Sequence, residues 1–93
     1  MKTDLRKFAR GQDCQMRIPM VCNFDPETTV LAHIRRAGVA GLGQKPPNII
    51  GIHCCSNCHD VLDGRTPHTL MDLDGLILDG LVRTLAIVSK EID

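Results

Sequence analysis

The chain has 93 residues, in which 11 basic residues balance 11 acidic ones, and two aromatic residues, both Phe. This length predicts one domain, and the absence of any apolar run of about 18 residues excludes a membrane-spanning helix. The core must be built from Leu, Ile, Val and Met. A chain this short is expected to need a covalent or metal cross-link.

Charge is distributed unevenly along the chain. Residues 1–65 hold nine of the basic residues and six acidic ones, whereas residues 66–93 hold two basic and five acidic residues. A normally solvated surface explains this pattern, and so does a phosphate-contacting face on the first part of the chain. Net charge alone does not indicate a nucleic-acid partner.

The first third of the chain predicts little regular structure. Residues 3–10 can form a short helix that ends at Gly11, and residues 12–27 are irregular because two prolines and an asparagine interrupt them. Residues 28–34, Thr-Thr-Val-Leu-Ala-His-Ile, are rich in β-branched residues and predict a strand.

A loop separates this strand from a second one. Residues 35–47 contain three glycines and two prolines, and the short apolar run 49–52 predicts the second strand. Residues 56–62 predict a short helix, with Ser56 as its N-cap and Gly64 just beyond its C-terminal end.

Residues 69–90 form the longest periodic segment, with Leu, Ile and Val recurring at helical spacing. Gly75 and Gly80 weaken this helix by roughly 1 kcal/mol each relative to Ala, but their small size permits close packing. Two roles stay open: a helix that covers the core, or a helix through which two copies form a homodimer.

Four cysteines carry the most specific signal. Seven residues separate Cys14 from Cys22, and Cys55 and Cys58 form a Cys-x-x-Cys pair that His59 follows. Two distant cysteine pairs supply the four thiolates of a tetrahedral structural zinc site, and the cross-link would close a long loop. The sequence therefore predicts zinc at these four cysteines.

Two other uses of the cysteines stay open, a disulfide framework and a redox or inert role. The chain has five cysteines, and its charged first residues lack the apolar segment of a signal peptide. No βαβ pattern surrounds the Cys-x-x-Cys pair, as a thioredoxin-like site would require. We therefore expect reduced cysteines and a cytoplasmic protein.

The order of these parts resembles the HNH, or ββα-metal, nuclease motif. A strand carrying His33 is followed by a loop, Asn48, a short strand, and a cysteine knuckle leading into a helix with His59. The resemblance covers roughly residues 14–65. Within that class the whole chain resembles the small lambdoid-prophage proteins of the YbcO nuclease type, through the stretches RGQDCQMRIPMVCNFDPETTVLAHIRRAG and KPPNIIGIHCCSNCHDVLDGRT.

The resemblance implies a role for each matching residue. His33 would be the general base, Asn48 would orient it through a backbone contact, and His59 would bind the catalytic divalent metal. Asp63, four residues after His59, lies on the same helix face and is the second candidate ligand. Two protein ligands suit Mg²⁺ or Mn²⁺ held partly by the substrate.

Each of these residues also has a simpler interpretation. His33 can be a strand histidine bonded to a backbone carbonyl, and Asn48 can be a turn residue after two prolines. His59 can be an extra zinc ligand, and Asp63 an acidic residue at a helix end.

One position departs from the HNH pattern. Many HNH proteins carry an acidic residue or a histidine directly before the base, and here that position is Ala32. The departure supports an alternative function, a non-catalytic zinc-containing DNA-binding or recombination accessory module. A protein-interaction domain that acts through the 69–90 helix is a third hypothesis.

Several polar residues remain outside the motif. Candidates for phosphate contacts are the basic residues that flank the predicted hairpin loop and helix, namely Arg35, Arg36, Lys45 and Arg65. Cys54 is expected to be a core thiol that can replace Cys55 as a ligand. His53 and His68 are expected at the surface or close to a metal ligand. The scarcity of aromatic residues argues against single-strand recognition by base stacking.

The sequence thus predicts an α+β fold in a single domain, residues 1–93. A zinc-stapled ββα unit would span residues 14–65, with an added helix over residues 69–90. The leading function is a metal-dependent DNA endonuclease of phage or prophage origin that hydrolyses phosphodiester bonds. Zinc would be structural, Mg²⁺ or Mn²⁺ catalytic, and no membrane would be involved.

Overall fold

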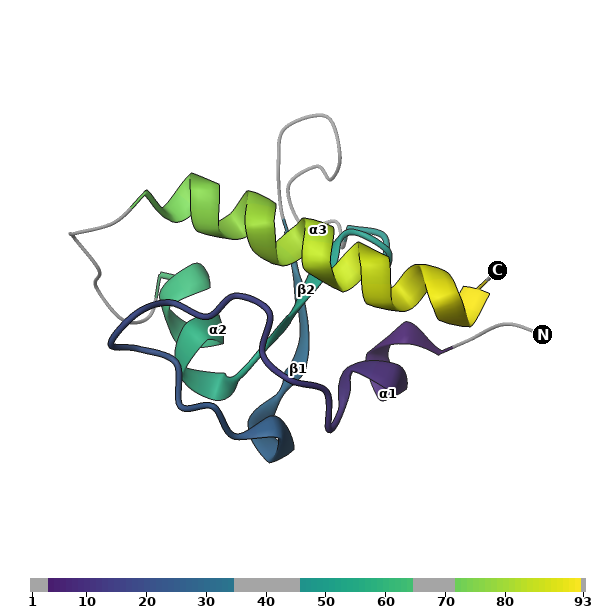
Figure 1. Cartoon of the computed structure of the whole chain (residues 1–93), viewed down its shortest axis with the longest axis horizontal. Coiled ribbons are helices and arrows are strands. Elements are labelled where there is room, and N and C mark those ends of the chain that lie inside the picture. Colours follow the sequence, from purple (N-terminus) through teal and green to yellow (C-terminus); the bar gives the residue numbers. More distant parts are fainter. Residues whose placement is uncertain (1–3, 35–45, 65–71, 93) are drawn as a thin grey trace.

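The computed structural model describes residues 4–34, 46–64 and 72–92, and confirms a small α+β fold. Its elements in chain order are α1 (Leu5–Ala9), the 3₁₀ helix η1 (Pro26–Thr28), β1 (Val30–His33), β2 (Gly51–Cys54), α2 (Ser56–Leu62) and α3 (Leu73–Ile92). The two strands form one antiparallel sheet. In Figure 1, α3 crosses this hairpin, with α2 at one side and α1 at the other.

Local side-chain chemistry sets the two short helices before the sheet. The Asp4 carboxylate accepts hydrogen bonds from the backbone N–H groups of Arg6 and Lys7, so it caps α1. Gly11, with a φ of 80°, turns the chain away after α1 as expected. The Asp25 carboxylate caps η1 in the same way, through the N–H of Glu27.

Both predicted strands are present, with different bounds. β1 is shorter than expected because η1 takes up Thr28. β2 begins at Gly51 rather than residue 49, because a turn closed by the 3.0 Å bond from Ile50 N–H to the Pro47 carbonyl uses the preceding residues. The sheet pairs Val30 with Cys54 and His33 with Gly51.

β2 lies at the centre of the structure, and all four of its residues are buried. One edge of β2 pairs with β1. At its other edge, the backbone of His53 makes two hydrogen bonds. Its carbonyl accepts the N–H of Gln15 at 2.7 Å, and its N–H donates to the Thr84 hydroxyl at 3.2 Å. The segment around Gln15 and helix α3 thus protect an edge that a two-stranded sheet would otherwise expose.

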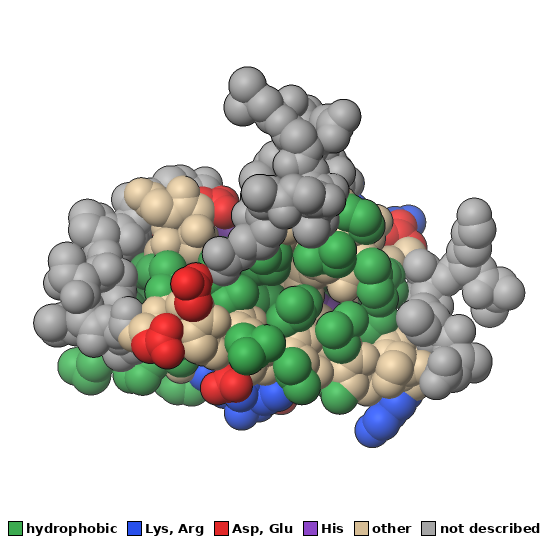
Figure 2. Space-filling model, turned by 90° about the horizontal axis from the view of Figure 1, so that it is seen from above, with side chains coloured by type: hydrophobic (Ala, Val, Ile, Leu, Met, Phe, Trp, Pro, Cys, Tyr) green, Lys and Arg blue, Asp and Glu red, His purple; other side chains and the backbone are tan. Residues whose placement is uncertain are grey.

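Helix α3 covers the hairpin, which is the first of its two predicted roles, a helix that covers the core. Its described part begins at Leu73, and the start of the predicted segment lies outside the described residues. Gly80 is buried, and a β-carbon added there would lie 3.1 Å from both the Gln15 carbonyl oxygen and the Ile52 side chain. This glycine therefore sets the close approach of α3 to β2. The opposite face of α3 leaves hydrophobic side chains exposed (Figure 2).

Candidate functional site

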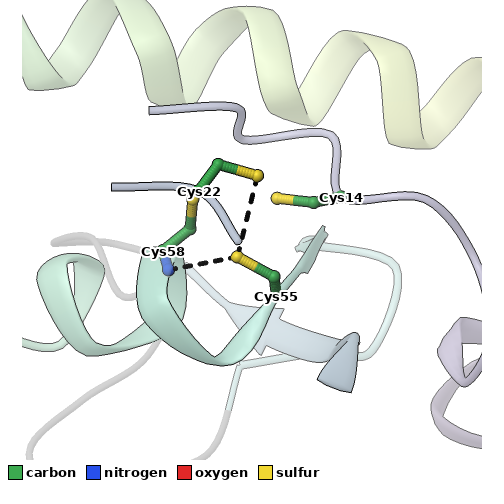
Figure 3. A group of neighbouring side chains, drawn as sticks. All are labelled: Cys14, Cys22, Cys55 and Cys58. Atoms are coloured by element: carbon green, nitrogen blue, oxygen red, sulfur yellow. Dashed lines mark hydrogen bonds between the residues drawn. The ribbon is translucent and has the colours of Figure 1, made fainter. Parts of the chain in front are cut away.

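Four cysteine side chains converge between the loop that follows α1 and the start of α2 (Figure 3). The sulfur atoms of Cys14, Cys22, Cys55 and Cys58 all lie within 4.8 Å of one another. None of the chain's cysteines forms a disulfide. The structure therefore brings together all four residues that the sequence predicted as one ligand set, and this cluster can hold a metal such as zinc.

The spacing of the sulfur atoms fits a tetrahedral ion. Zinc–sulfur bonds of about 2.3 Å place the sulfurs of a tetrahedron about 3.8 Å apart, whereas a disulfide brings them to about 2.05 Å. The Cys22 and Cys55 sulfurs lie 3.8 Å apart. The donor set, four thiols with no oxygen ligand among them, is also the set that structural zinc prefers.

The thiols influence one another strongly at this distance. A hydrogen bond from Cys58 is the main cause that lowers the pKa of Cys14 to about 4. Burial raises the pKa of Cys22 to about 11, and the hydrogen bond with Cys14, together with burial, raises the pKa of Cys58. Cys14 thus loses its proton readily, whereas Cys22 and Cys58 resist losing theirs, so the four sulfurs do not all ionise together. A bound cation would remove this conflict, because it stabilises all four thiolates.

Backbone geometry directs the first cysteine pair toward the second. Between Cys14 and Cys22 the chain contains two residues with left-handed backbone, Arg17 and Met20, with φ of 51° and 65°. The Cys22 N–H then bonds the Ile18 carbonyl at 2.9 Å and closes the turn. Such conformations are unusual for residues other than glycine, so the turn is held by its surroundings.

Two asparagines attach this turn to α2. The Asn57 side-chain amide donates to the Val21 carbonyl at 3.1 Å, and the Asn23 amide donates to the Ser56 hydroxyl at 3.1 Å. From the sequence, Asn23 was expected only to interrupt regular structure, and Asn57 had no predicted role. Their positions next to Cys22 and inside the Cys-x-x-Cys pair are the signal that identifies them.

The expected N-cap of α2 was wrong. Ser56 is the first helical residue, and Cys55 is the N-cap, since its sulfur accepts the N–H of Cys58 at 3.4 Å. A thiolate suits this place because the first turn of a helix presents unpaired N–H groups. The predicted extent of the helix, residues 56–62, is confirmed, and Gly64 follows it with a φ of 78°.

The two residues before Cys55 belong to the core. Cys54 is fully buried and lies outside the sulfur cluster, which confirms a core thiol, and burial raises its pKa. The expectation that His53 lies at the surface was wrong. Its side chain is fully buried, its ring centroid is 5.9 Å from that of Phe8, and neither ring nitrogen has a hydrogen-bond partner among the described residues. Burial lowers the pKa of His53, so the core holds a neutral ring.

His33 and Asn48 meet at the other end of the hairpin. The turn from Pro47 to Ile50 returns the chain beside the end of β1, where the Ile34 N–H bonds the Ile50 carbonyl at 3.1 Å. His33 Nε2 and Asn48 Oδ1 are 2.8 Å apart. This contact joins the two side chains, and the backbone contact of Asn48 that the family resemblance implied stays a prediction. Both side chains are half-buried.

His59 and Asp63 form a second pair, on α2. The His59 Nε2 and Asp63 Oδ2 atoms are 3.1 Å apart, as the spacing of four residues along a helix allows. The imidazole is 27% exposed and the carboxylate side chain 41% exposed, so both are accessible from solvent. The predicted convergence of these two side chains is therefore present in the structure.

The two pairs remain separate groups. Among residues 4–34, 46–64 and 72–92, the four cysteines are the one group of three or more ligating side chains close enough to share an ion. Ala32, where many HNH proteins carry a ligand, is fully buried. The predicted phosphate contacts Arg35, Arg36, Lys45 and Arg65, together with His68, lie outside the described residues.

Comparison with known proteins places the chain in a family. The family profile described as "Putative nuclease YbcO" matches residues 3–92. The chain belongs to the YbcO family. It is 52% identical over 89 residues to "Putative nuclease YbcO" of Escherichia coli K12 and to "Putative nuclease ybcO" of Enterobacteria phage 82, covering 95% of this chain and 93% of each relative.

A solved structure supports the same placement. "Structure of a putative bacteriophage protein from Escherichia coli str. K-12 substr. MG1655" matches with a TM-score of 0.72 and 46% sequence identity, over 92% of this chain and 96% of that one. The resemblance predicted from sequence is thus confirmed at the level of the YbcO family and its phage association. Among the described helices of this YbcO family member, none is long and apolar enough to cross a membrane.

Proposed function

We propose that this YbcO family member is a metal-dependent DNA endonuclease of the HNH type, which hydrolyses phosphodiester bonds. The hydrogen bond between His33 and Asn48 carries the proposal. An amide oxygen only accepts hydrogen bonds, so His33 Nε2 donates to Asn48 and the neutral ring keeps a lone pair on Nδ1. Hydrolysis needs such a base to take a proton from the attacking water.

The position of His33 suits a base that acts on a bulky substrate. It is the last residue of β1, directly opposite Gly51, and its ring is half-buried. Its attachment to β1 and its bond to Asn48 fix the ring's orientation, while partial exposure leaves it open to a phosphodiester. Orientation of this kind is a large part of what a catalytic side chain supplies.

The pair of His59 and Asp63 supports a divalent-metal site. Cis ligands of an octahedral ion with bonds of about 2.1 Å lie about 3 Å apart. The 3.1 Å between the two side-chain atoms matches that spacing. Mg²⁺ or Mn²⁺ held there would stabilise the charge that develops on the phosphate and on the leaving oxygen. Because Ala32 supplies no ligand, the remaining positions would go to water and phosphate oxygens.

Zinc at the four cysteines has a structural role in this proposal. Four thiolates fill a tetrahedral ion and leave no position for water or substrate. The cluster instead connects the turn that ends at Cys22 to the helix that carries His59. The order β1, β2 and α2 around these residues is that of the HNH motif, which further supports the assignment.

DNA is the proposed partner, with the basic residues of the hairpin loop and the segment after α2 contacting phosphate. Arg35, Arg36, Lys45 and Arg65 supply that charge. Contacts of this type position the backbone and carry no sequence information by themselves.

Cleavage of supercoiled plasmid and of branched DNA, with Mg²⁺, with Mn²⁺ or with no added divalent metal, tests the proposal. The wild type should nick DNA in a metal-dependent way, and His33→Ala should reduce the rate by about 10²- to 10⁴-fold. Val30→Ala on the same strand is the matched control, because Val30 is exposed and outside the site. Its activity should equal that of the wild type.

The alternative is a non-catalytic DNA-binding or recombination accessory module, favoured by Ala32 in the place of a metal ligand. In that case the wild type and His33→Ala would bind DNA equally, and neither would cleave it with any metal. Zinc content must be equal in all samples, so that lost activity is not confused with lost folding.

A further inference from the structure

The outer face of α3 carries a stripe of exposed hydrophobic side chains. Leu78 is 60% exposed, Val82 56% and Leu85 37%. Their spacing of four and then three residues places them in one line along a helix. The buried residues Ile77, Thr84 and Val88 lie about 100° around the helix from this stripe, against the core. Figure 2 shows hydrophobic side chains gathered along this face of α3.

Small residues continue the stripe at both of its ends. Gly75 precedes Leu78 at the same helical spacing, and Ser89 follows Leu85. The Ser89 hydroxyl donates to the Ala86 carbonyl at 2.9 Å, so it does not need water as a partner. A second helix can therefore approach closely along the whole stripe without stranding a polar group.

Charge along one edge of the stripe indicates which helix can pair with it. Asp79 and Lys90 are both exposed and are eleven residues apart, which is almost exactly three turns, so they lie in line along α3. In a parallel two-fold pair of α3 helices, this edge of one copy and the same edge of the other would lie on opposite sides of the seam, so the charges would not meet. In an antiparallel pair, Asp79 of one copy faces Lys90 of the other, twice by symmetry.

Hydrophobic and charged pairing require registers that differ by only two residues. Opposing Asp79 with Lys90 places the two-fold axis between Thr84 and Leu85. Opposing Val82 with Leu85, the normal arrangement at an antiparallel helix seam, places it between Arg83 and Thr84. The two axes differ by one residue, so the partner helix slides by two residues, about 3 Å, between the two registers. The register that opposes Val82 with Leu85 also places the large Leu78 opposite the small Ser89.

We propose that α3 is a homodimer interface, in which two copies pair antiparallel through Leu78, Val82 and Leu85 with Asp79 bonded to Lys90 of the second copy. One helix pair buries less area than a standard interface, so the expected Kd lies between about 1 µM and 1 mM. One consequence rests on the proposed function. The two hairpins would be related by a two-fold axis, as are the two strands of duplex DNA.

Sedimentation equilibrium of the full chain with zinc bound tests the interface without any cleavage assay. The wild type should reach the mass of two chains, and Val82→Asp should raise the Kd at least about 10-fold. Met20→Asp is the matched control, because Met20 is an exposed hydrophobic residue away from α3 and the charge change is the same. Its Kd should stay that of the wild type. A wild type that is monomeric throughout, or equal Kd values for the two variants, overturns the proposal.

Exchange of the two charges tests the antiparallel register. Asp79→Lys alone and Lys90→Asp alone should each raise the Kd by about 10-fold, because each turns two attractive contacts into repulsive ones. The double variant should return to the wild-type Kd. Single variants that weaken dimerisation without recovery in the double variant overturn the pairing of Asp79 with Lys90. Zinc content and circular dichroism of every variant establish that the fold is intact.

Discussion

The two ends of the β hairpin are built in opposite ways. Where β2 ends, Cys55 joins three other cysteines in a cluster whose members are mostly buried and come from two separate segments of the chain. Where β1 ends, His33 and Asn48 form one half-buried pair. The first end connects distant segments, and the second presents polar atoms to solvent. Substitutions should therefore affect folding at the cysteine end and activity at the histidine end.

The largest effect is expected at the cysteine cluster. Cys58→Ser removes one of four ligands, and the protein should unfold, because structural zinc contributes about 10–16 kcal/mol whereas a domain is stable by only about 5–15 kcal/mol. Circular dichroism and zinc analysis measure both consequences. Excess chelator should unfold the wild type in the same way.

Cys54→Ala is the matched control for that change. Cys54 is as deeply buried as Cys58 but lies outside the cluster. The variant should lose only about 1 kcal/mol of stability and keep one zinc per chain. A Cys58→Ser protein that stays folded without zinc would refute the structural role of the cluster.

The second effect concerns activity at α2. His59→Ala should lower metal-dependent DNA cleavage by at least about 100-fold, since a catalytic metal is worth several kcal/mol, while zinc content and fold remain. Asp60→Ala is the control, because Asp60 is adjacent in sequence but turned about 100° away on the helix. Equal activity losses in the two variants would count against a metal held by His59.

A smaller loss of activity is expected at Asn48. Asn48→Ala removes the side-chain oxygen that orients His33, and the rate should fall by about 10- to 100-fold, the scale typical of a group that orients another. Asn48→Asp keeps an acceptor at the same place and should retain more activity than Asn48→Ala. Single-turnover cleavage rates measure the hydrolysis step directly. Identical rates for Asn48→Ala and the wild type would show that the hydrogen bond has no role in the reaction.

The smallest effect is expected in the middle of the hairpin, at His53. Its ring nitrogens are buried without partners, so His53→Leu should raise the free energy of unfolding by about 1 kcal/mol. His53→Ala should instead lower it by about 2–3 kcal/mol, because it leaves a cavity beside Phe8. Urea unfolding with saturating zinc at neutral pH distinguishes the two. If both variants are destabilised equally, His53 has a hydrogen-bonding partner such as a buried water.

The expectations that came from spacing agree well with the structure. The Cys-x-x-Cys pair and the i, i+4 pair of His59 and Asp63 are local patterns, and the short helix at which they lie has the predicted bounds. The strand bounds were less accurate, because the turn at Pro47 and the 3₁₀ helix at Pro26 each use residues that the apolar pattern assigned to a strand.

The sequence by itself determined the family, the α+β class and the set of four cysteines, because these depend on which residue types occur and on their spacing within short segments. Only the tertiary structure decided that His53 is buried, that Cys55 caps a helix and that Asn48 contacts His33. His53 is buried because Phe8 and Thr84, far from it in the chain, pack around β2. Cys55 caps α2 because the cluster holds its sulfur there, and Asn48 reaches His33 because the Pro47 turn folds back onto β1. Burial and contact of this kind arise from packing between distant segments, and a local pattern does not record them.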